Sequence, residues 1–396
     1  MISRSAQPFV PGFSQTADLK SNNTALVLYI LLTHPHIARS EIIKLTRLAP
    51  STVSNITADL IERGLIRRVG NLGQGGAGRK SELLARNPQA TGVAAIHITP
   101  ERCTLGVVDL GYETSGDREI IFDAGFTEAD TDSVLDELAG LIGSAGGTSK
   151  LGAIGLAIPN HPYNIPEIER RFRDRFPSLP LYRINNTEAM AVYEYYLRLR
   201  RDYHTIAYVY VGTGIGSGLV INGDLYQGVN GNACDLGHMY MTDRPLVCRC
   251  GRVGCVETVA SERSVGERLR EHFGLSHSPV REELIEFLSA RLRDNDPFVV
   301  DLLGEAAEYL GKAIFNLVAI ADPQLLVVAG RFNALNPFYS SLVEEAYMAR
   351  ARMIPKEIVP IEFRPVQANA GLIGAAMFSF ISLFCSVGKG TAAAVE

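Results

Sequence analysis

One histidine and three cysteines stand close together in the middle of the chain. His238 is followed after nine residues by Cys248, and Cys250 and Cys255 complete the group. Imidazole nitrogen and thiolate sulfur are donors that Zn²⁺ prefers, and four protein donors leave no open position for a catalytic water. The spacing therefore predicts a structural Zn²⁺ site. The alternative is a set of free cysteines in a turn, although free cysteines usually stand alone in apolar segments.

The apolar spacing near the N-terminus predicts three helices, with Ser40 and Ser51 capping the second and third and Gly64 ending the third. The apolar face of the third helix consists of Val53, Ile56, Leu60 and Ile61. Its other side carries small polar side chains, which suit contacts with base edges in a DNA major groove. The predicted DNA contacts on this helix are Ser51, Thr52, Ser54, Asn55 and Thr57.

A hairpin is predicted next, with strands over residues 65–69 and 82–85 and a glycine-rich tip between them. Arg79 and Lys80 on this tip can approach phosphates closely. Residues 1–89 carry a net charge of +6, whereas the rest of the chain carries −11, which indicates a polyanionic partner for the head alone. We therefore predict a winged helix-turn-helix that binds double-stranded DNA. An ordinary three-helix bundle with a solvated hairpin is the alternative.

The 396 residues suit two or three domains, and 46% of them are hydrophobic, enough for a large core. We predict a flexible arm over residues 1–20, the winged helix-turn-helix over 21–88 and an α/β body over 89–396. Strands are predicted in the body at 105–109, 151–157, 205–211 and 325–329. The apolar stretch 371–384 is too short to span a bilayer and is predicted to be a buried helix.

The sequence indicates neither a signal peptide nor a disulfide framework. No long apolar run follows a basic start at the N-terminus. Outside the cluster, Cys103, Cys234 and Cys385 stand apart from one another and are interpreted as lone core thiols. We therefore expect a cytoplasmic protein that contacts no membrane.

Several segments resemble the ROK family, which groups repressors, open reading frames and sugar kinases. The resemblance spans roughly residues 90–380 and is most specific in the His/Cys block, residues 228–261. Further matching segments are 152–159, 184–194, 209–223 and 325–332. The head and its wing are similar to the repressor branch, of which xylose and N-acetylglucosamine repressors are examples. The resemblance implies that the body has an actin-like (ribonuclease H-like), two-lobed sugar-kinase fold.

Two departures separate this chain from the kinases of the family. Those kinases open the domain with an Asp-Gly-Gly-Thr type of phosphate loop, whereas residues 96–101 read Ile-His-Ile-Thr-Pro-Glu and offer no glycine. Where kinases carry Asn-Asp, this chain has Asn185-Asn186, and an amide cannot replace the family's catalytic base. We therefore expect no kinase activity, with the glycine loop 212–216 kept as a structural turn.

The resemblance also implies sugar binding. The implied contacts are Asn185, Asn186, Asp235, His238 and Glu257, with Asp235 in place of the family's usual Glu. Amides and carboxylates suit hydroxyl-rich ligands. In the alternative interpretation these groups cap helices and orient the metal-binding histidine, and Glu257 is a simple surface acid. The segment 159–177 is also short for the family's substrate loop.

These features favour a sequence-specific transcriptional repressor of sugar-metabolism genes. A sugar or sugar-phosphate effector would act by binding two conformations with different affinities. Paired recognition helices suit paired half-sites of an operator, so a homodimer or a dimer of dimers is expected. Two alternatives stay open. One is a ROK-type sugar kinase with a regulatory DNA-binding head, and the other is a ligand-independent repressor controlled by a protein partner.

Overall fold

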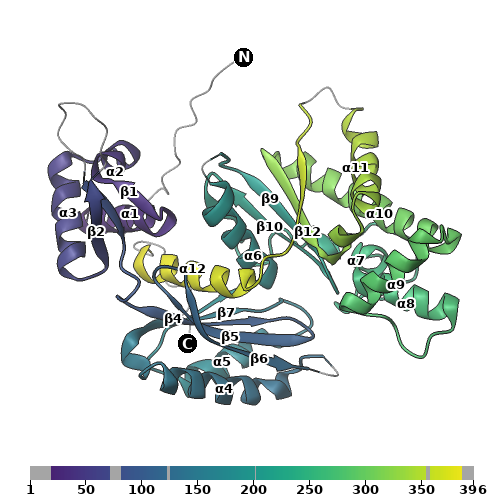
Figure 1. Ribbon diagram of the computed structural model, residues 1–396, viewed down its shortest axis with the longest axis horizontal. Helices are drawn as coiled ribbons and strands as arrows, with labels where there is room; N and C mark the ends of the chain where they lie inside the picture. The colour runs from purple at the N-terminus through teal and green to yellow at the C-terminus, as the bar shows by residue number, and fades with distance from the viewer. Residues whose placement is uncertain (1–18, 72–81, 123–124, 201, 354–356, 386–396) are drawn as a thin grey trace. The chain divides into compact units, whose positions relative to one another are not determined.

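The computed structural model describes residues 19–71, 82–122, 125–200, 202–353 and 357–385 (Figure 1). The chain divides into two compact units. The first comprises Met1–Ile158, Tyr163–Arg198 and Gly371–Glu396, and the second comprises Pro159–Pro162 and Leu199–Ala370. The chain therefore passes from one unit to the other more than once, and the first unit holds both the N-terminal head and an α/β lobe.

The head combines three helices with a small antiparallel sheet of order β1-β3-β2. Its elements are α1 (Leu19–Thr33), β1 (His36–Ala38), α2 (Arg39–Thr46), α3 (Pro50–Glu62), β2 (Ile66–Asn71) and β3 (Glu82–Arg86). The arrangement is a winged helix-turn-helix, as predicted. Gly64 follows α3 with a φ of +72°, a backbone conformation that glycine adopts without strain at the end of a helix.

The predicted helix caps are wrong. Helix α2 begins two residues earlier than expected, with Ala38 rather than Ser40 at its N-cap. Helix α3 begins at Pro50, with Ala49 rather than Ser51 at its N-cap. Proline suits the first helical position because its φ is already helical and because the N–H it lacks would have had no partner there.

The lobe of the first unit is built on a five-stranded sheet of order β6-β5-β4-β7-β8. Its strands are β4 (Gly92–Ile98), β5 (Arg102–Asp109), β6 (Thr114–Ile121), β7 (Leu151–Ala157) and β8 (Leu181–Ile184). Its helices are η1 (Glu128–Asp130), α4 (Thr131–Ser144), η2 (Thr148–Lys150), α5 (Ile165–Arg175), α6 (Asn186–Glu194), the π-helix η3 (Tyr195–Leu199) and α12 (Ala370–Cys385).

Helices cover both faces of this sheet. Helices α4 and α5 lie on one side and α12 lies on the other (Figure 1). The side chains of α4 and α5 share one hydrophobic core with the sheet. On the opposite face, a Cβ atom on Gly155 would come within 2.6 Å of the Ser379 hydroxyl, so the glycine permits close packing of α12. Helix α12 confirms the prediction of a buried C-terminal helix.

The second unit contains another five-stranded sheet, of order β11-β10-β9-β12-β13. Its strands are β9 (Ile206–Val211), β10 (Ile215–Ile221), β11 (Asp224–Leu225), β12 (Leu325–Gly330) and β13 (Ile361–Arg364). Its helices are η4 (Leu236–His238), α7 (Glu257–Ala260), α8 (Glu262–Phe273), α9 (Arg281–Arg293), α10 (Pro297–Ala321), η5 (Arg331–Leu335) and α11 (Phe338–Ala351). The core of this unit lies between the sheet and these helices.

The two large sheets share one topology. In each, the first three strands in sequence pair antiparallel, and the fourth and fifth extend the sheet in parallel from the first. This duplicated arrangement is that of the actin-like fold, so the predicted fold class is confirmed. Within the described ranges, no helix is both long and apolar enough to cross a membrane.

Candidate functional site

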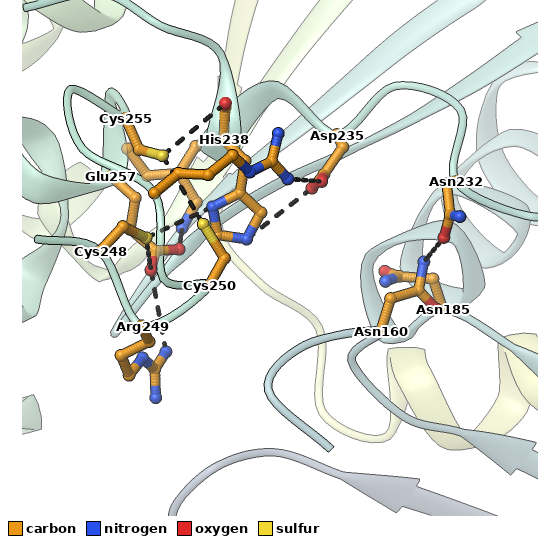
Figure 2. A network of polar contacts seen from close by, with 12 residues as sticks. Asn160, Asn185, Asn232, Asp235, His238, Cys248, Arg249, Cys250, Cys255 and Glu257 are labelled. Carbon is orange, nitrogen blue, oxygen red and sulfur yellow. Dashed lines mark hydrogen bonds and ion pairs between the residues drawn. The ribbon is translucent and has the colours of Figure 1, made fainter. Parts of the chain in front are cut away.

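The predicted metal ligands lie together in the second unit (Figure 2). The donor atoms of His238, Cys248, Cys250 and Cys255 all lie within 4.8 Å of one another. The Nδ1 atom of His238 is 3.4 Å from the Cys248 sulfur, and the sulfurs of Cys250 and Cys255 are 3.8 Å apart. The positive φ angles of Gly251 and Gly254, +83° and +84°, allow the tight turns that bring the cysteines back toward the histidine.

The donor set fits a metal ion. Burial raises the pKa of the Cys248 thiol, and burial together with the charge of Cys248 raises the pKa of Cys255 to about 12. Adjacent buried thiolates are therefore unfavourable unless a cation compensates their charge. Three sulfur donors and one imidazole nitrogen, all within 4.8 Å of one another, are the donor set of a closed tetrahedral site. The cluster can hold a metal.

Asp235 lies beside the outer edge of the cluster. One of its carboxylate oxygens is 4.0 Å from Nε2 of His238, the ring nitrogen that faces away from Cys248, and the other is 3.9 Å from the Arg252 guanidinium. A carboxylate placed behind a metal-binding histidine orients the ring and favours its binding tautomer. At 4.0 Å this contact is longer than a hydrogen bond, so Asp235 lies beside His238 as an electrostatic partner only.

Glu257 begins α7 and is only 4% exposed, so the interpretation of this residue as a simple surface acid is wrong. Its carboxylate accepts a hydrogen bond from the backbone N–H of Ile215 at 2.9 Å. The same carboxylate pairs with Arg263 at 3.1 Å. It also lies 4.0 Å from Arg249 (Figure 2). A buried carboxylate with these partners is held in one position beside the cluster.

Asn185 and Asn186 lie in the first unit, at the N-terminus of α6. Asn185 is the N-cap residue, and its side-chain oxygen accepts from Thr187 N at 2.9 Å. Glu188 completes a capping box by accepting from Asn185 N. The Asn186 side-chain oxygen also accepts from Thr187 N, at 2.9 Å. Asn185 therefore caps α6, and Asn186, the first residue of the helix, supplies no carboxylate base.

The two loops that would hold phosphates in a kinase make hydrogen bonds within the protein. The turn between β4 and β5 is closed by Thr99 N and Arg102 N, which bond to Arg102 O and to the Thr99 hydroxyl. In the glycine loop between β9 and β10, Gly212 N donates to Gly214 O, and the Tyr210 ring lies against Gly212. These contacts support the interpretation of the glycine loop as a structural turn, and they give residues 96–101 the same character.

The DNA-contacting residues predicted on α3 divide by exposure. Ser51 and Asn55 are exposed, and Thr52 and Ser54 are half-buried. Thr57 was predicted to contact DNA, but this prediction is wrong. Its side chain is fully buried, and its hydroxyl donates to Val53 O at 2.8 Å. One helical turn from Val53 it lies on the apolar face, where threonine satisfies its own hydroxyl. Arg79 and Lys80 lie outside the described residues.

Several polar residues near the cluster were missed from the sequence. Asn160 donates to Gly231 O and to the Asn232 side chain, at 3.0 and 3.2 Å, and the His161 ring packs edge-on against His238. Nothing in the local sequence of Asn160 and His161 indicates this position, because they follow a strand of the other unit. Arg249 stands between Cys248 and Cys250 in the sequence. Its position between two predicted metal ligands could have indicated that it lies near the cluster.

Comparison with known proteins places both parts of the chain. The ROK family profile matches residues 135–379, and a MarR family profile matches residues 18–75. A putative xylose repressor from Caldicellulosiruptor sp. is 27% identical over 90% of this chain and 94% of its own length. The DNA-binding transcriptional dual regulator NagC of Escherichia coli is 24% identical over 87% of this chain and 88% of its own length. A crystal structure of a ROK family transcriptional regulator, a homologue of the E. coli MLC protein, aligns with a TM-score of 0.73 at 22% identity, covering 93% of this chain and 97% of that one.

Proposed function

The chain belongs to the ROK family, and on this premise we propose that it is a DNA-binding transcriptional repressor of sugar-metabolism genes. The family contains both kinases and regulators. The proposal therefore depends on the DNA-binding head and on two kinase features that the body lacks, the carboxylate base and the first glycine-containing phosphate loop. Repressors that match about nine-tenths of the chain, the head included, support it.

The observation that carries the proposal is the exposed polar side of α3. Ser51 and Asn55 face solvent on the second helix of a helix-turn-helix, while the opposite face of the same helix is buried in the head. Exposed cations accompany it on neighbouring elements, among them Lys44, Arg47 and Arg67. Exposed amide and hydroxyl groups read base edges, whereas cations bind phosphates without reading sequence.

The test is selection of a duplex operator from random DNA, followed by titration with variants. We expect Asn55→Ala to relax base preference at one position of each half-site, at a cost of about 1–3 kcal/mol. Arg47→Ala should weaken binding evenly across sequences and lower the salt slope by about 1. Arg293→Ala, an exposed arginine of α9, is the matched control and should change nothing. If Asn55→Ala leaves the selected sequence and its affinity unchanged, base reading by α3 is refuted.

We further propose a sugar or sugar phosphate as the effector. The candidate contacts are Asn185 and Asn186 in the first unit and Asp235, His238 and Glu257 in the second. Support comes from their polar chemistry and from relatives that are named for xylose and N-acetylglucosamine. A cytoplasmic location suits such an effector and a DNA partner.

Isothermal titration with xylose, N-acetylglucosamine and their phosphates tests this part. Glu257→Gln should weaken binding of the sugar that titrates, because a neutral amide is a poorer acceptor than a carboxylate. The exposed Glu344→Gln of α11 is the control. A panel without any binding would refute a sugar effector from this set and favour control by a protein partner.

Loss of kinase activity is part of the proposal. Asn186 provides no base, and both candidate phosphate loops make their hydrogen bonds within the protein. The retained glycine loop is the feature that favours the alternative of a kinase with a regulatory head. A coupled assay with ATP and a panel of hexoses decides between them, and measurable turnover would establish the kinase.

We propose Zn²⁺ as the metal of the His238–Cys255 cluster, in a structural role, and a homodimer or dimer of dimers as the assembly that reads an operator. When bound, the ion would compensate the charge of the three thiolates. Plasma emission spectrometry of the purified protein should find about one zinc ion per chain. Sedimentation velocity measurements should find a dimer or a larger assembly. A metal-free protein that is folded and binds DNA would contradict the structural role.

A further inference from the structure

Helix α6 and the π-helix that continues it connect two regions of the first unit that the proposed function uses. The N-terminus of α6 carries Asn185 and Asn186, two of the proposed sugar contacts. Its continuation, residues 195–199, carries Tyr196, which contacts the head. Eleven residues separate Asn185 from Tyr196, which corresponds to about 16 Å along a helix axis.

Tyr196 contacts α1 of the head through a buried pair of hydroxyl groups. The hydroxyl oxygens of Tyr29 and Tyr196 are 2.9 Å apart, and the rings meet edge to face with centroids 6.3 Å apart. The two residues are 9% and 6% exposed. A hydrogen bond shielded from water in this way is sensitive to a small displacement of either helix, because no water can replace the lost partner.

A second contact holds α1 of the head, one helical turn beyond Tyr29. The carbonyl of Leu32 accepts from the Arg86 guanidinium at 2.7 Å and from the Tyr112 hydroxyl at 2.8 Å. Tyr112 belongs to the turn between β5 and β6, so this contact anchors α1 to the sheet. Helix α1 packs against α2 and α3, so a change in its position reaches the recognition helix. The sheet contact provides a fixed point and the Tyr196 contact provides the variable one.

Helix α6 is suited to transmit a displacement as a rigid body. All but two of its nine residues are buried, including Glu188 and Glu194. Gly374 of α12 lies directly against the Ala189 carbonyl, where a Cβ atom would clash. Close-packed interiors transmit strain rather than absorb it. The change to π-helical geometry falls at Tyr195–Leu199, and such segments are frequent at functional sites.

We propose that α6 and its π-helical end couple the proposed sugar contacts to the DNA-binding head, and that the Tyr29–Tyr196 hydroxyl pair is the contact through which the head responds. This inference rests on the proposed function. By linkage, if the effector changes operator affinity by a given factor, operator DNA must change effector affinity by the same factor.

Conservative removal of one hydroxyl tests the contact. For the protein with the selected operator, the dissociation constant is measured with and without saturating xylose or N-acetylglucosamine. We expect Tyr29→Phe or Tyr196→Phe to reduce the effector-induced change by about five-fold, in line with the loss of one hydrogen bond. The double variant should lose less than the sum of the two single variants, because both remove the same hydroxyl pair. Tyr339→Phe, which removes the hydroxyl of a buried tyrosine of α11 in the second unit, is the control and should keep the full response.

Hydrogen exchange with operator DNA as the only ligand gives a test that needs no sugar. In the wild type, DNA binding should change the exchange of amides 186–194, and in Tyr196→Phe it should not. An unchanged exchange of α6, or an undiminished sugar response in Tyr196→Phe, would overturn the coupling. If neither sugar shifts operator affinity while DNA still alters exchange in α6, the effector proposal fails and the coupling stands. If DNA does not bind at all, both fail.

Discussion

His97 gives this protein a sensitivity to mild acid that the structure makes calculable. The residue lies on β4, and its ring packs against Gly371 near the start of α12. Its Nε2 atom is buried and has no hydrogen-bond partner among the described residues. Burial, and to a lesser extent the charge of Arg102, lowers the pKa of His97 to about 4. The folded protein therefore holds this histidine neutral.

The sign and size of the effect follow from linkage. In the unfolded chain the pKa of a histidine is about 6.5, so between pH 6.5 and pH 4 the unfolded state binds more protons than the folded state. Stability is therefore fully retained above pH 6.5 and falls as the pH drops through this window. From pH 7 to pH 5 the loss from His97 alone is about 2 kcal/mol. For a unit of this size, that loss of unfolding free energy would lower the urea concentration at the unfolding midpoint by about 0.7–1 M.

The assay is urea unfolding followed by circular dichroism at pH 7 and pH 5. His97→Phe keeps a ring against Gly371 and removes the titrating group, so the variant should lose about 2 kcal/mol less than the wild type between the two pH values. His277→Gln removes a histidine that is 67% exposed and serves as the control. All other titrating groups are common to wild type and variant, and their effects cancel in the difference. Equal pH dependence of wild type and His97→Phe would refute the assignment of a depressed pKa to His97.

Three further substitutions test separate parts of the structure. Thr57→Val should leave the selected operator sequence unchanged and alter stability by less than about 1 kcal/mol, because the hydroxyl bonds only within its own helix; an altered base preference in gel-shift titration would contradict its burial. Arg86→Met should destabilise the head by about 1–3 kcal/mol in urea unfolding, and not by more, because the Leu32 carbonyl keeps the Tyr112 hydroxyl as a donor. Cys255→Ser should abolish stoichiometric metal in emission spectrometry and make the loop before it sensitive to protease, and a protease-resistant variant would argue against a metal-stabilised loop.

Local signals in the sequence were sufficient for the elements and for the metal cluster. Strand 151–157 was predicted with its observed bounds, and the buried helix 371–384 differs by one residue at each end. The spacing of the cysteines and glycines was enough to predict the metal cluster. Its ligands are close in sequence, and glycine permits the turns between them. Thr57 was misassigned because the orientation of a short polar side chain on an apolar helix face depends on packing, which the pattern does not specify.

Contacts between distant segments could not be predicted in the same way. The duplicated order of the two five-stranded sheets was expected only from the family resemblance, because strand pairing joins segments that are far apart in the chain and no local pattern specifies it. The hydrogen bond from Ile215 N to Glu257 spans 42 residues, and the Tyr29–Tyr196 pair spans 167. The charge and type of Glu257 allowed either a surface or a buried role, and only the fold selected the buried one.

The N-terminus of α6 shows how one position can lose a chemical role and keep a mechanical one. An aspartate there would accept a proton from a sugar hydroxyl, whereas Asn186 cannot. The N-cap of the helix is Asn185, one residue earlier, so the cap does not depend on an aspartate at 186, and the oxygens of Asn185 and Asn186 both accept from Thr187 N. Under the proposed function, an amide in place of the base would remove phosphoryl transfer without loosening the helix that runs to Tyr196. A body with closed phosphate loops has no use for the base, but a regulator needs the helix to stay rigid from the candidate sugar contacts to the head.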